Sequence, residues 1–336
     1  MRALVSVRTG GPETLELATL PDPVAGPGDI RIAVAACGVN YPDALIIEDR
    51  YQFRPERPFS PGAEVSGVVD QLGEGVSGFR IGDRVLGGNV CGGLAEKMVL
   101  PAVRCYGMPA SMPFDEASAF LMTYGTSHHA LKDRARLQPG ETLLVLGAAG
   151  GVGLAAVELG KHMGARVIAG VSSEEKLAVA RARGADAGFV YAPGPLDKAQ
   201  GRALTEEIRA LADGEVDVIY DPVGGSYSEP ALRSLAWDGR FLVVGFPAGI
   251  PSIPLNLPLL KGCHVIGVFW GSFIERFPER NRANVEELLE WYEQGAIRPL
   301  VSARFDLAQG GQAIAQLVGR AVVGKLVVEV GGAPID

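Results

Sequence analysis

The sequence predicts an α/β protein that contains a doubly wound parallel sheet and a second, β-rich domain. The first observation is the run LLVLGAAGGVG (143–153), in which an apolar strand passes through small residues into an apolar helix. The second is a change of pattern along the chain. Short β-like runs with turn signals fill roughly the first 120 residues, and strand and helix patterns alternate from about residue 139.

The β-rich part is predicted from short apolar or alternating runs, of which 30–34 and 65–69 are the clearest. Turn signals such as Pro27-Gly28-Asp29 separate these runs, which is typical of a compact barrel or sandwich. The tail has β patterns at 301–305 and 325–330, so we expect the chain to return to its first domain. The predicted boundaries are 1–120, completed by 300–336, for the β-rich domain and 121–299 for the α/β domain.

In the α/β part, apolar runs and amphipathic segments follow one another in the order that builds a parallel sheet. A helix that ends at Gly184 has the residue that commonly follows a helix C-terminus. The run 265–269 is predicted to be an edge strand, and because an apolar edge needs cover, we expect a homodimer. The other predicted elements are strands at 142–147, 166–171, 216–220 and 241–245 and helices at 153–163 and 173–183.

The composition is that of an ordinary globular protein and excludes several function classes. Of 336 residues, 47% are hydrophobic and 21% are charged, and the net charge of −8 gives no support to a nucleic-acid or anionic-membrane partner. The uncharged stretch 241–260 contains four prolines, so it is not predicted to cross a membrane. No two of the four cysteines stand at CxxC spacing, and no histidines pair as metal ligands, so we expect a cytoplasmic protein with no metal site.

The glycine-rich turn predicts a dinucleotide site. Small residues let the backbone approach a pyrophosphate, and the N-terminus of the following helix offers free N–H groups and the positive end of a dipole. The preceding strand and the following helix supply the context that such a motif requires. The residues predicted to hold the pyrophosphate are Ala148, Ala149, Gly150, Gly151, Val152 and Gly153.

The next strand ends in residues that favour NADPH over NADH. An NAD site usually has a carboxylate at this strand tip, whereas here the tip is Ser172-Ser173, with Lys176 within one helical turn. Hydroxyl donors and a cation at a helix N-terminus are suited to a 2′-phosphate. Two alternatives remain open: Ser172 and Glu175 have capping-box spacing, and Lys176 can be a solvated surface charge.

Five segments, distributed along the chain, are typical of one protein family. In order, they are GVNYPD (38–43), PGAEVSGVV (61–69), GFRIGDRV (78–85), AAGGVG (148–153) and DPVGG (221–225). With them the chain resembles the medium-chain dehydrogenase/reductase superfamily and, within it, the zinc-free NADPH:quinone oxidoreductase (ζ-crystallin-like) family. The resemblance covers essentially the whole chain and implies a Rossmann domain plus a GroES-like domain.

The chain departs from the zinc-dependent members at the metal ligands. By resemblance, Asn40 and Ala63 stand where those members carry a cysteine and a histidine, and Glu64 alone does not make a catalytic zinc site. Without a Lewis acid, we expect an acceptor that is already electron-poor, such as a quinone or an enone.

The resemblance also implies roles for side chains around the cofactor. Thr126 is expected beside the nicotinamide, which Phe246 and Phe269 are expected to flank. The other residues implied for the 2′-phosphate site are Ser172, Lys176, Tyr191 and Arg320. For each there is a plainer alternative: a packing hydroxyl for Thr126, core aromatics for the phenylalanines, a strand-end aromatic for Tyr191 and a surface charge for Arg320.

On the substrate side we single out Asn40 and Tyr51 as candidate catalytic residues. Asn40 is also a candidate to hydrogen-bond the nicotinamide or a substrate oxygen, and Tyr51 to donate to a developing oxyanion. Tyr51 can equally be a lining aromatic. Asp43 is expected to be structural, and Trp270 is either a pocket wall or a packing residue.

The leading functional hypothesis is an NADPH-dependent quinone reductase that works without a metal. The first alternative is an enone or enoyl-thioester reductase, for which Arg50, Arg54 and Arg57 would form a basic rim; such a cluster is otherwise a solvated loop face. The second alternative is a non-catalytic NADPH-binding protein.

Overall fold

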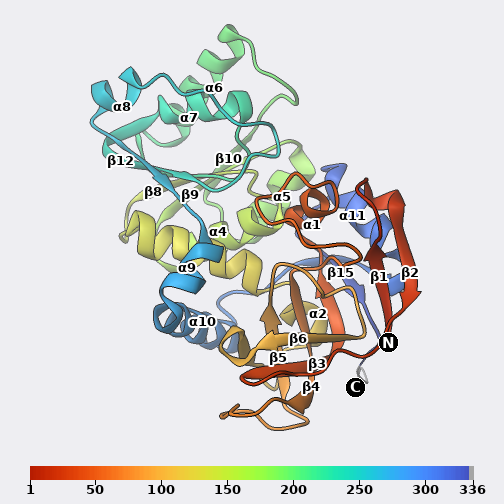
Figure 1. Cartoon of the computed structure of the whole chain (residues 1–336). Coiled ribbons are helices and arrows are strands. Elements are labelled where there is room, and N and C mark those ends of the chain that lie inside the picture. Colours follow the sequence, from red (N-terminus) through yellow and green to blue (C-terminus); the bar gives the residue numbers. More distant parts are fainter. Residues whose placement is uncertain (333–336) are drawn as a thin grey trace. The chain divides into compact units, whose positions relative to one another are not determined.

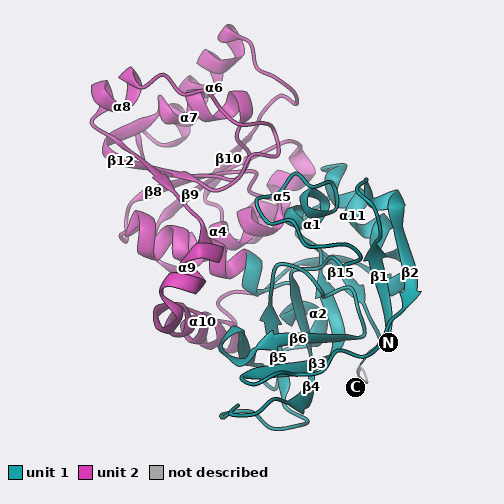
Figure 2. Cartoon of the chain, in the orientation of Figure 1, with its two compact units in different colours: residues 1–122, 298–336 teal, residues 123–297 magenta. Residues whose placement is uncertain are grey.

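The computed structural model of the chain describes residues 1–332 (Figure 1). Its contacts divide the chain into two compact units, which Figure 2 colours separately. Unit 1 comprises Met1–Met122 together with the described residues from Arg298 onward, and unit 2 comprises Thr123–Ile297. The chain thus leaves unit 1, builds unit 2 and returns.

Unit 2 contains, within the described residues, a six-stranded sheet in the order β10-β9-β8-β11-β12-β13. Every neighbouring pair is parallel. The first strand lies in the middle, the next two extend to one side and the last three to the other, which is the doubly wound arrangement. The strands are β8 (Thr142–Leu146), β9 (Arg166–Val171), β10 (Ala187–Val190), β11 (Val216–Asp221), β12 (Leu235–Val243) and β13 (His264–Gly267).

Alternate side chains of β8 pack against different helices. Leu144 and Leu146 belong to a buried cluster with Leu204 of α6 and Leu232 of α7. Leu143 lies on the other side, against Gly160 of α4, where an added Cβ would lie 2.4 Å from Leu143 Cδ2 and force that side chain to move. The helices of unit 2 after β8 are α4 (Gly151–His162), α5 (Glu174–Ala182), α6 (Lys198–Leu211), α7 (Ser228–Leu232, preceded by the 3₁₀ turn η5, Gly225–Tyr227), α8 (Asn256–Lys261), α9 (Trp270–Arg276) and α10 (Pro278–Glu293).

A helical segment with π-helical hydrogen bonding precedes β8. It consists of η3 (Leu121–Gly125), the short α3 (Thr126–His128) and η4 (His129–Ala135). Such wide turns inside helices often occur at functional sites. The sequence analysis did not predict this segment.

Unit 1 is built on a seven-stranded sheet of described residues in the order β14-β15-β3-β4-β5-β7, with β6 paired to β3. Only the pair β14 and β15 is parallel. A separate hairpin joins β1 to β2. The strands are β1 (Arg2–Ser6), β2 (Leu15–Thr19), β3 (Asp29–Gly38), β4 (Glu64–Leu72), β5 (Arg84–Gly88), β6 (Lys97–Pro101), β7 (Cys105–Gly107), β14 (Val301–Asp306) and β15 (Lys325–Glu329).

Short helices close the ends of this sheet. Helix α1 (Tyr41–Ile47) follows β3 directly and packs Ile46 and Ile47 into the core beside Ile314 of α11 (Gly310–Val318). The remaining helical elements of unit 1 are α2 (Phe114–Ala117) and the 3₁₀ turns η1 (Pro12–Thr14), η2 (Ala102–Arg104) and η6 (Leu307–Gln309). The segment from the end of β3 into α1 is therefore held on both sides by core packing.

The predicted fold class, a doubly wound parallel sheet plus a β-rich domain, is confirmed. Some element ends differ from the predictions: β12 begins at Leu235 instead of Phe241, and β13 ends at Gly267 instead of Phe269. Among the described residues, no helix is both long and apolar enough to span a membrane.

Candidate functional site

The glycine-rich turn of unit 2 has the backbone that a pyrophosphate requires. Gly147 turns the chain at a φ of +60°, and Gly150 caps α4. A Cβ at Gly153 would collide with the Gly147 carbonyl oxygen, so only glycine allows α4 to approach the turn this closely. The N–H groups of the first turn of α4, including those of Gly151 and Val152, have no intrahelical acceptors. They form a ready anion site at the carboxyl end of β8.

The side chains at the tip of β9 lie together. Lys176 Nζ donates to Ser172 Oγ at 3.0 Å, and burial lowers the pKa of the lysine. The cap of α5 comes from Ser173, whose Oγ accepts from Lys176 N at 3.3 Å. The capping-box alternative with Ser172 and Glu175 is therefore wrong, and Ser172 remains an exposed hydroxyl beside a cation.

Tyr191 follows β10 and contacts Tyr227, with ring centroids 4.8 Å apart. Its backbone N–H donates to the Val171 carbonyl oxygen at 2.9 Å. Tyr191 thus extends the β9–β10 pairing at the same sheet edge as Ser172. Its ring is half-buried against the core of unit 2.

The segment that carries Thr126 is tied to the glycine-rich turn through its neighbour Ser127. Ser127 Oγ lies 2.9 Å from the Val152 carbonyl oxygen and 2.9 Å from Tyr220 Oη. Thr126 itself is half-buried. The sequence analysis missed Ser127, and its only signal was a hydroxyl next to the expected threonine.

Asp221 organises the turn after β11. Its carboxylate accepts from the backbone N–H groups of Val223 and Gly224, each at 2.9 Å, and from Ser228 Oγ at 2.5 Å. Burial raises its pKa. Gly224 and Gly225 follow with positive φ values, so the DPVGG segment is a built turn at the carboxyl edge of the sheet.

The two phenylalanines expected near the nicotinamide are not core residues. Phe246 follows β12 and is 43% exposed, and Phe269 precedes α9 and is 44% exposed. The alternative that both are simply core is wrong. Trp270, in contrast, is buried: its Nε1 donates to Asn281 at 3.0 Å, and its ring lies against Gly125, so it is a packing residue.

In unit 1, a buried polar network surrounds Asn40. Asn40 Nδ2 donates to Glu64 Oε1 at 2.9 Å, and its Oδ1 accepts from Lys325 Nζ at 2.6 Å. Lys325 Nζ also forms an ion pair with Glu64 Oε1 at 2.7 Å. All three side chains are buried. Lys325 was missed by the sequence analysis, because a lysine at the start of an apolar strand looks like a surface charge.

Asp43 supports this network from α1. Its two carboxylate oxygens accept from Asn40 N at 2.7 Å and from Gly62 N at 3.2 Å. Burial raises its pKa to about 7, although both N–H donors and the Lys325 ammonium act against the rise. The expectation that Asp43 is structural agrees with these contacts.

Tyr51 is half-buried at the edge of the unit 1 core, with its ring 6.1 Å from that of Phe53. Burial, and to a smaller degree the Asp43 charge, raises the pKa of its phenol. Arg320 also belongs to unit 1, in the turn after α11, where it is exposed and has a φ of +59°.

In the basic cluster of the enoyl-thioester alternative, Arg57 is part of the scaffold, whereas Arg50 and Arg54 are exposed. Arg57 donates to Asp49 at 2.9 Å and to the Ile47 carbonyl oxygen at 2.9 Å, and Arg50 pairs with Glu48 at 2.8 Å.

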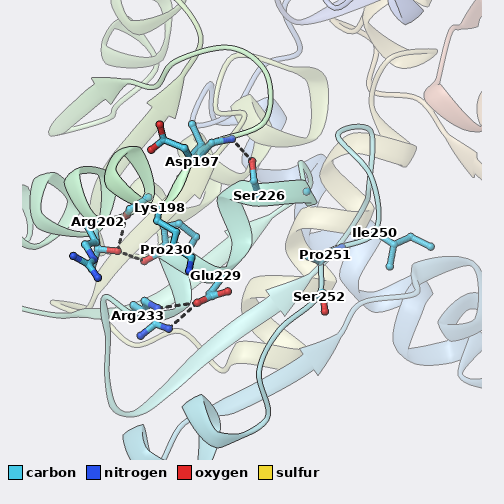
Figure 3. A pocket seen from close by; sticks show the side chains of 14 residues that line it. Asp197, Lys198, Arg202, Ser226, Glu229, Pro230, Arg233, Ile250, Pro251 and Ser252 are labelled. Carbon is cyan, nitrogen blue, oxygen red and sulfur yellow. Dashed lines mark hydrogen bonds and ion pairs between the residues drawn. The ribbon is translucent and has the colours of Figure 1, made fainter.

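A separate cavity of about 720 Å³ lies in unit 2 among α6, α7 and residues 250–252 (Figure 3). Its walls carry Lys198 and Arg202, and an ion pair between Arg233 and Glu229 at 2.7 Å. None of the predicted cofactor residues lines it. Among the described residues, no cluster of three or more histidine, cysteine, aspartate or glutamate side chains could hold a metal ion.

Models of known protein families match a segment in each of the two units. The family model described as an alcohol dehydrogenase GroES-like domain matches residues 26–110, and the one described as a zinc-binding dehydrogenase matches residues 151–291. Quinone oxidoreductase-like protein 2 homolog of Nematostella vectensis is 39% identical over 310 residues, which cover 90% of this chain and 82% of the relative.

Comparison with solved structures also finds similar proteins over nearly the whole chain. A mycobacterial protein complexed with NADPH has a TM-score of 0.91 and 31% identity and covers 98% of this chain and 100% of its own. Escherichia coli quinone oxidoreductase complexed with NADPH has a TM-score of 0.89 and 26% identity, with coverage of 98% and 100%. The chain therefore belongs to the medium-chain dehydrogenase/reductase superfamily, within its quinone oxidoreductase-like family.

Proposed function

We propose that the protein is an NADPH-dependent reductase that transfers reducing equivalents to a quinone without a metal ion. The observation that carries this proposal is the pairing of Lys176 with Ser172, next to the glycine-rich turn at the carboxyl edge of the sheet. The names of the relatives, and the NADPH complexes of two structural neighbours, support it.

The residues present fit a dinucleotide. Gly147 and Gly153 allow a tight turn into a long helix, and beyond the Gly147 carbonyl oxygen at 3.5 Å nothing in the described part of the chain lies within 4 Å of a Cβ placed at Gly150, so the turn is open there. When bound there, NADPH supplies the reducing equivalents. The side chains that would hold it, as proposed from the sequence, are Asn40, Thr126, Ser172, Lys176, Tyr191, Phe246, Phe269 and Arg320, with the backbone of 148–153 on the pyrophosphate.

The preference for NADPH over NADH follows from the strand tip. Lys176 and Ser172 offer an ammonium and a hydroxyl, and a 2′-phosphate accepts hydrogen bonds from both. A ribose without that phosphate gains less from the ammonium. The exposed Glu174 and Glu175 belong to the first turn of α5, beyond the cap at Ser173.

Metal-free chemistry is supported by what surrounds Glu64. Its Oε1 is already paired with the Lys325 ammonium at 2.7 Å and with the Asn40 amide at 2.9 Å. A divalent cation at this carboxylate would meet a second positive charge in a buried site. Since Asn40 and Ala63 supply no ligands of the zinc type, the acceptor has to be activated by itself, as a quinone is.

Tyr51 is proposed as the residue that offers a proton or a hydrogen bond to the reduced oxygen. The phenol of a tyrosine carries its proton at neutral pH, and burial raises the pKa of Tyr51 further, so the group can donate a hydrogen bond. If Tyr51 donates to the reduced oxygen, Tyr51→Phe should lower kcat for quinone reduction about tenfold or more. If the ring of Tyr51 only lines the site, kcat should stay unchanged.

The enone or enoyl-thioester alternative now has less support than the quinone. It relied on a basic rim, and two of the three arginines of that rim are held by neighbouring carboxylates. We also propose a cytoplasmic location, because all four cysteines, which lie within the described residues, are free thiols.

The test is NADPH oxidation by the purified protein, with a small para-quinone and an α,β-unsaturated ketone as parallel acceptors. We expect turnover on the quinone with kcat/KM at least about tenfold above that on the enone, a difference of about 1.4 kcal/mol in the barrier. Faster turnover on the enone would move the function to the first alternative. NADPH binding without oxidation on either acceptor would point to the non-catalytic one.

A further inference from the structure

The register of three neighbouring strands brings a lysine to the candidate site from the far end of the chain. In the antiparallel pair of β15 and β3, Val327 lies opposite Gly38, and continuing this register by two residues on each strand brings Lys325 to Asn40. On the other side of β3, Gly38 pairs with Glu64 at the start of β4. Lys325, Asn40 and Glu64 therefore meet at one end of the same sheet.

The donors of Lys325 are all used. Its Nζ donates to the Val39 carbonyl oxygen at 2.9 Å, to Asn40 Oδ1 at 2.6 Å and to Glu64 Oε1 at 2.7 Å. An ammonium has three N–H groups, and each has a partner here. The lysine is 5% exposed, so it is part of the interior of unit 1 and not a surface charge.

Its contacts determine how the Asn40 amide points. Nδ2 donates to Glu64 Oε1 at 2.9 Å and to the Gly38 carbonyl oxygen at 3.1 Å, so both of its hydrogens are used. A flipped amide would put its NH₂ group against the ammonium and its oxygen against the carboxylate. The charges of Lys325 and Glu64 thus exclude the flipped orientation of the Asn40 amide.

We propose that Lys325 is a positioning residue for the cofactor site, because its ammonium holds Asn40 as a hydrogen-bond acceptor. Asn40 Oδ1 has two lone pairs, and Lys325 takes one of them. Because both Nδ2 hydrogens are used, Oδ1, which also faces the Asp43 N–H in the capping box of α1, is the only atom that the side chain can offer to a ligand, and it can offer it only as an acceptor. Asn40 can then bind a hydroxyl or an amide N–H, but it has no hydrogen to offer to an oxyanion.

This polarity selects the partner of Asn40. A quinone or an enone has only acceptor oxygens, so neither can hydrogen-bond to Asn40 Oδ1. The nicotinamide nucleoside half of NADPH has both ribose hydroxyls and a carboxamide NH₂, which are donors. The inference rests on the assignment of Asn40 to the cofactor site proposed above, and of the two partners expected from the sequence it favours the nicotinamide half over a substrate oxygen.

Stability alone does not account for the network. A buried ion pair often contributes little compared with apolar side chains of the same volume, so the pair is better explained by the geometry that it imposes. Lys325→Met alone would leave Glu64 without its cation and could unfold the chain. The charge-balanced variant Lys325→Met/Glu64→Gln removes both charges and keeps the side-chain volumes.

The experiment is a double-mutant cycle on nucleotide affinity, measured by fluorescence titration. Its variants are Asn40→Ala, Lys325→Met/Glu64→Gln and their combination. We expect Asn40→Ala and the charge-balanced variant each to raise the Kd of NADPH by about three- to tenfold, the range of one hydrogen bond. The combination should raise it no further than Asn40→Ala does, because Lys325 acts through Asn40.

Two controls separate positioning from a general structural effect. Adenosine 2′,5′-bisphosphate lacks the nicotinamide nucleoside, so its Kd should stay unchanged in all variants. Lys97→Met removes another ion-paired lysine of the same sheet, whose partner is Asp22 and not Asn40, and should leave NADPH affinity unchanged.

The proposal is overturned if the charge-balanced variant binds NADPH like the wild type, if its effect multiplies with that of Asn40→Ala, or if adenosine 2′,5′-bisphosphate weakens in parallel. Because these measurements need no turnover, they are independent of the acceptor. If the double-mutant cycle gave the expected Kd values but the protein did not reduce quinones, the proposed quinone reductase activity would be refuted. The proposed role of Lys325 would still stand.

Discussion

At the scale of single residues, the candidate site contains buried ionisable groups whose surroundings shift their protonation. Asp43 is the clearest case, because burial raises its pKa to about 7 from the usual 3.8 of an aspartate. A carboxyl whose pKa is higher in the folded state favours folding while it is protonated. Its contribution is therefore complete below about pH 4 and is lost as the pH rises to about 7.

The substitution Asp43→Asn tests this pH dependence of the free energy of unfolding. The amide has one oxygen, so it can accept from Asn40 N or from Gly62 N but not from both, and the variant should be less stable by about 1–3 kcal/mol at pH 5. At pH 8 the difference in free energy of unfolding between wild type and variant should be smaller, because the wild type now carries a buried charge. Urea denaturation at both pH values measures it, and a difference that does not change with pH would contradict the raised pKa.

Lys176 makes a second prediction at this scale, about cofactor choice. Lys176→Ala removes the ammonium that sits on Ser172 and should raise KM for NADPH by about tenfold or more, with little change for NADH. Lys198→Ala is the matched control: it also removes a lysine of unit 2, but one that lines the separate cavity of Figure 3. Equal effects on NADPH and NADH would show that Lys176 does not bind the 2′-phosphate.

At the scale of elements, two glycines of the glycine-rich turn have different roles: one is needed for packing and the other for contact with the ligand. A Cβ at Gly153 would strike the Gly147 carbonyl oxygen, whereas a Cβ at Gly150 would lie 3.5 Å from that oxygen, in ordinary contact and at a φ of −78°. Gly153→Ala should therefore cost about 1–3 kcal/mol of stability and abolish NADPH binding.

Gly150→Ala should keep the melting temperature of the wild type and still weaken NADPH, because its new methyl group would point into the pyrophosphate cradle. Thermal melts measure the stability of both variants, and NADPH titrations measure their affinity for the cofactor. If Gly150→Ala bound NADPH normally, the pyrophosphate would not lie against this turn.

The elements that the sequence predicted well are those with local signals. The strand at 166–171 was predicted with its observed ends, since an apolar run between Gly164 and the serine pair leaves little choice. Helix α5 was predicted within a residue at each end, because Gly184 follows it at a φ of +109°. The π-helical segment from Leu121 to Ala135 gives no comparable signal, since its apolar residues fit any buried helix.

The same reasoning explains what was found of the site and what was not. The glycine-rich turn and the pair of Ser172 and Lys176 lie within short stretches of sequence, so their chemistry can be predicted from the local sequence. Lys325 and Asn40 are far apart in the chain and meet only through the register of β15 on β3. Neither side chain alone indicates an ion-paired amide, so this part of the site needed the structure.

At the scale of the whole molecule, the edge of the unit 2 sheet carries several exposed apolar side chains. Strand β13 is the last strand of its sheet, and Val265 on it is 46% exposed. Leu259 and Leu260 of the preceding α8 are 77% and 68% exposed, and Trp237 of β12 is 76% exposed. Unpaired strand edges and apolar side chains of this kind are normally covered, and a second copy of the chain can pair its own β13 here.

We therefore predict a homodimer that forms through β13 and α8. Sedimentation velocity at micromolar concentration should give a dimer for the wild type and a monomer for Leu259→Glu, because burying a carboxylate in an apolar interface costs several kcal/mol. Val24→Glu changes an equally exposed apolar residue of unit 1, 73% exposed, and should remain dimeric. A monomeric wild type would refute the interface, and a dimer that survives Leu259→Glu would place it on another face.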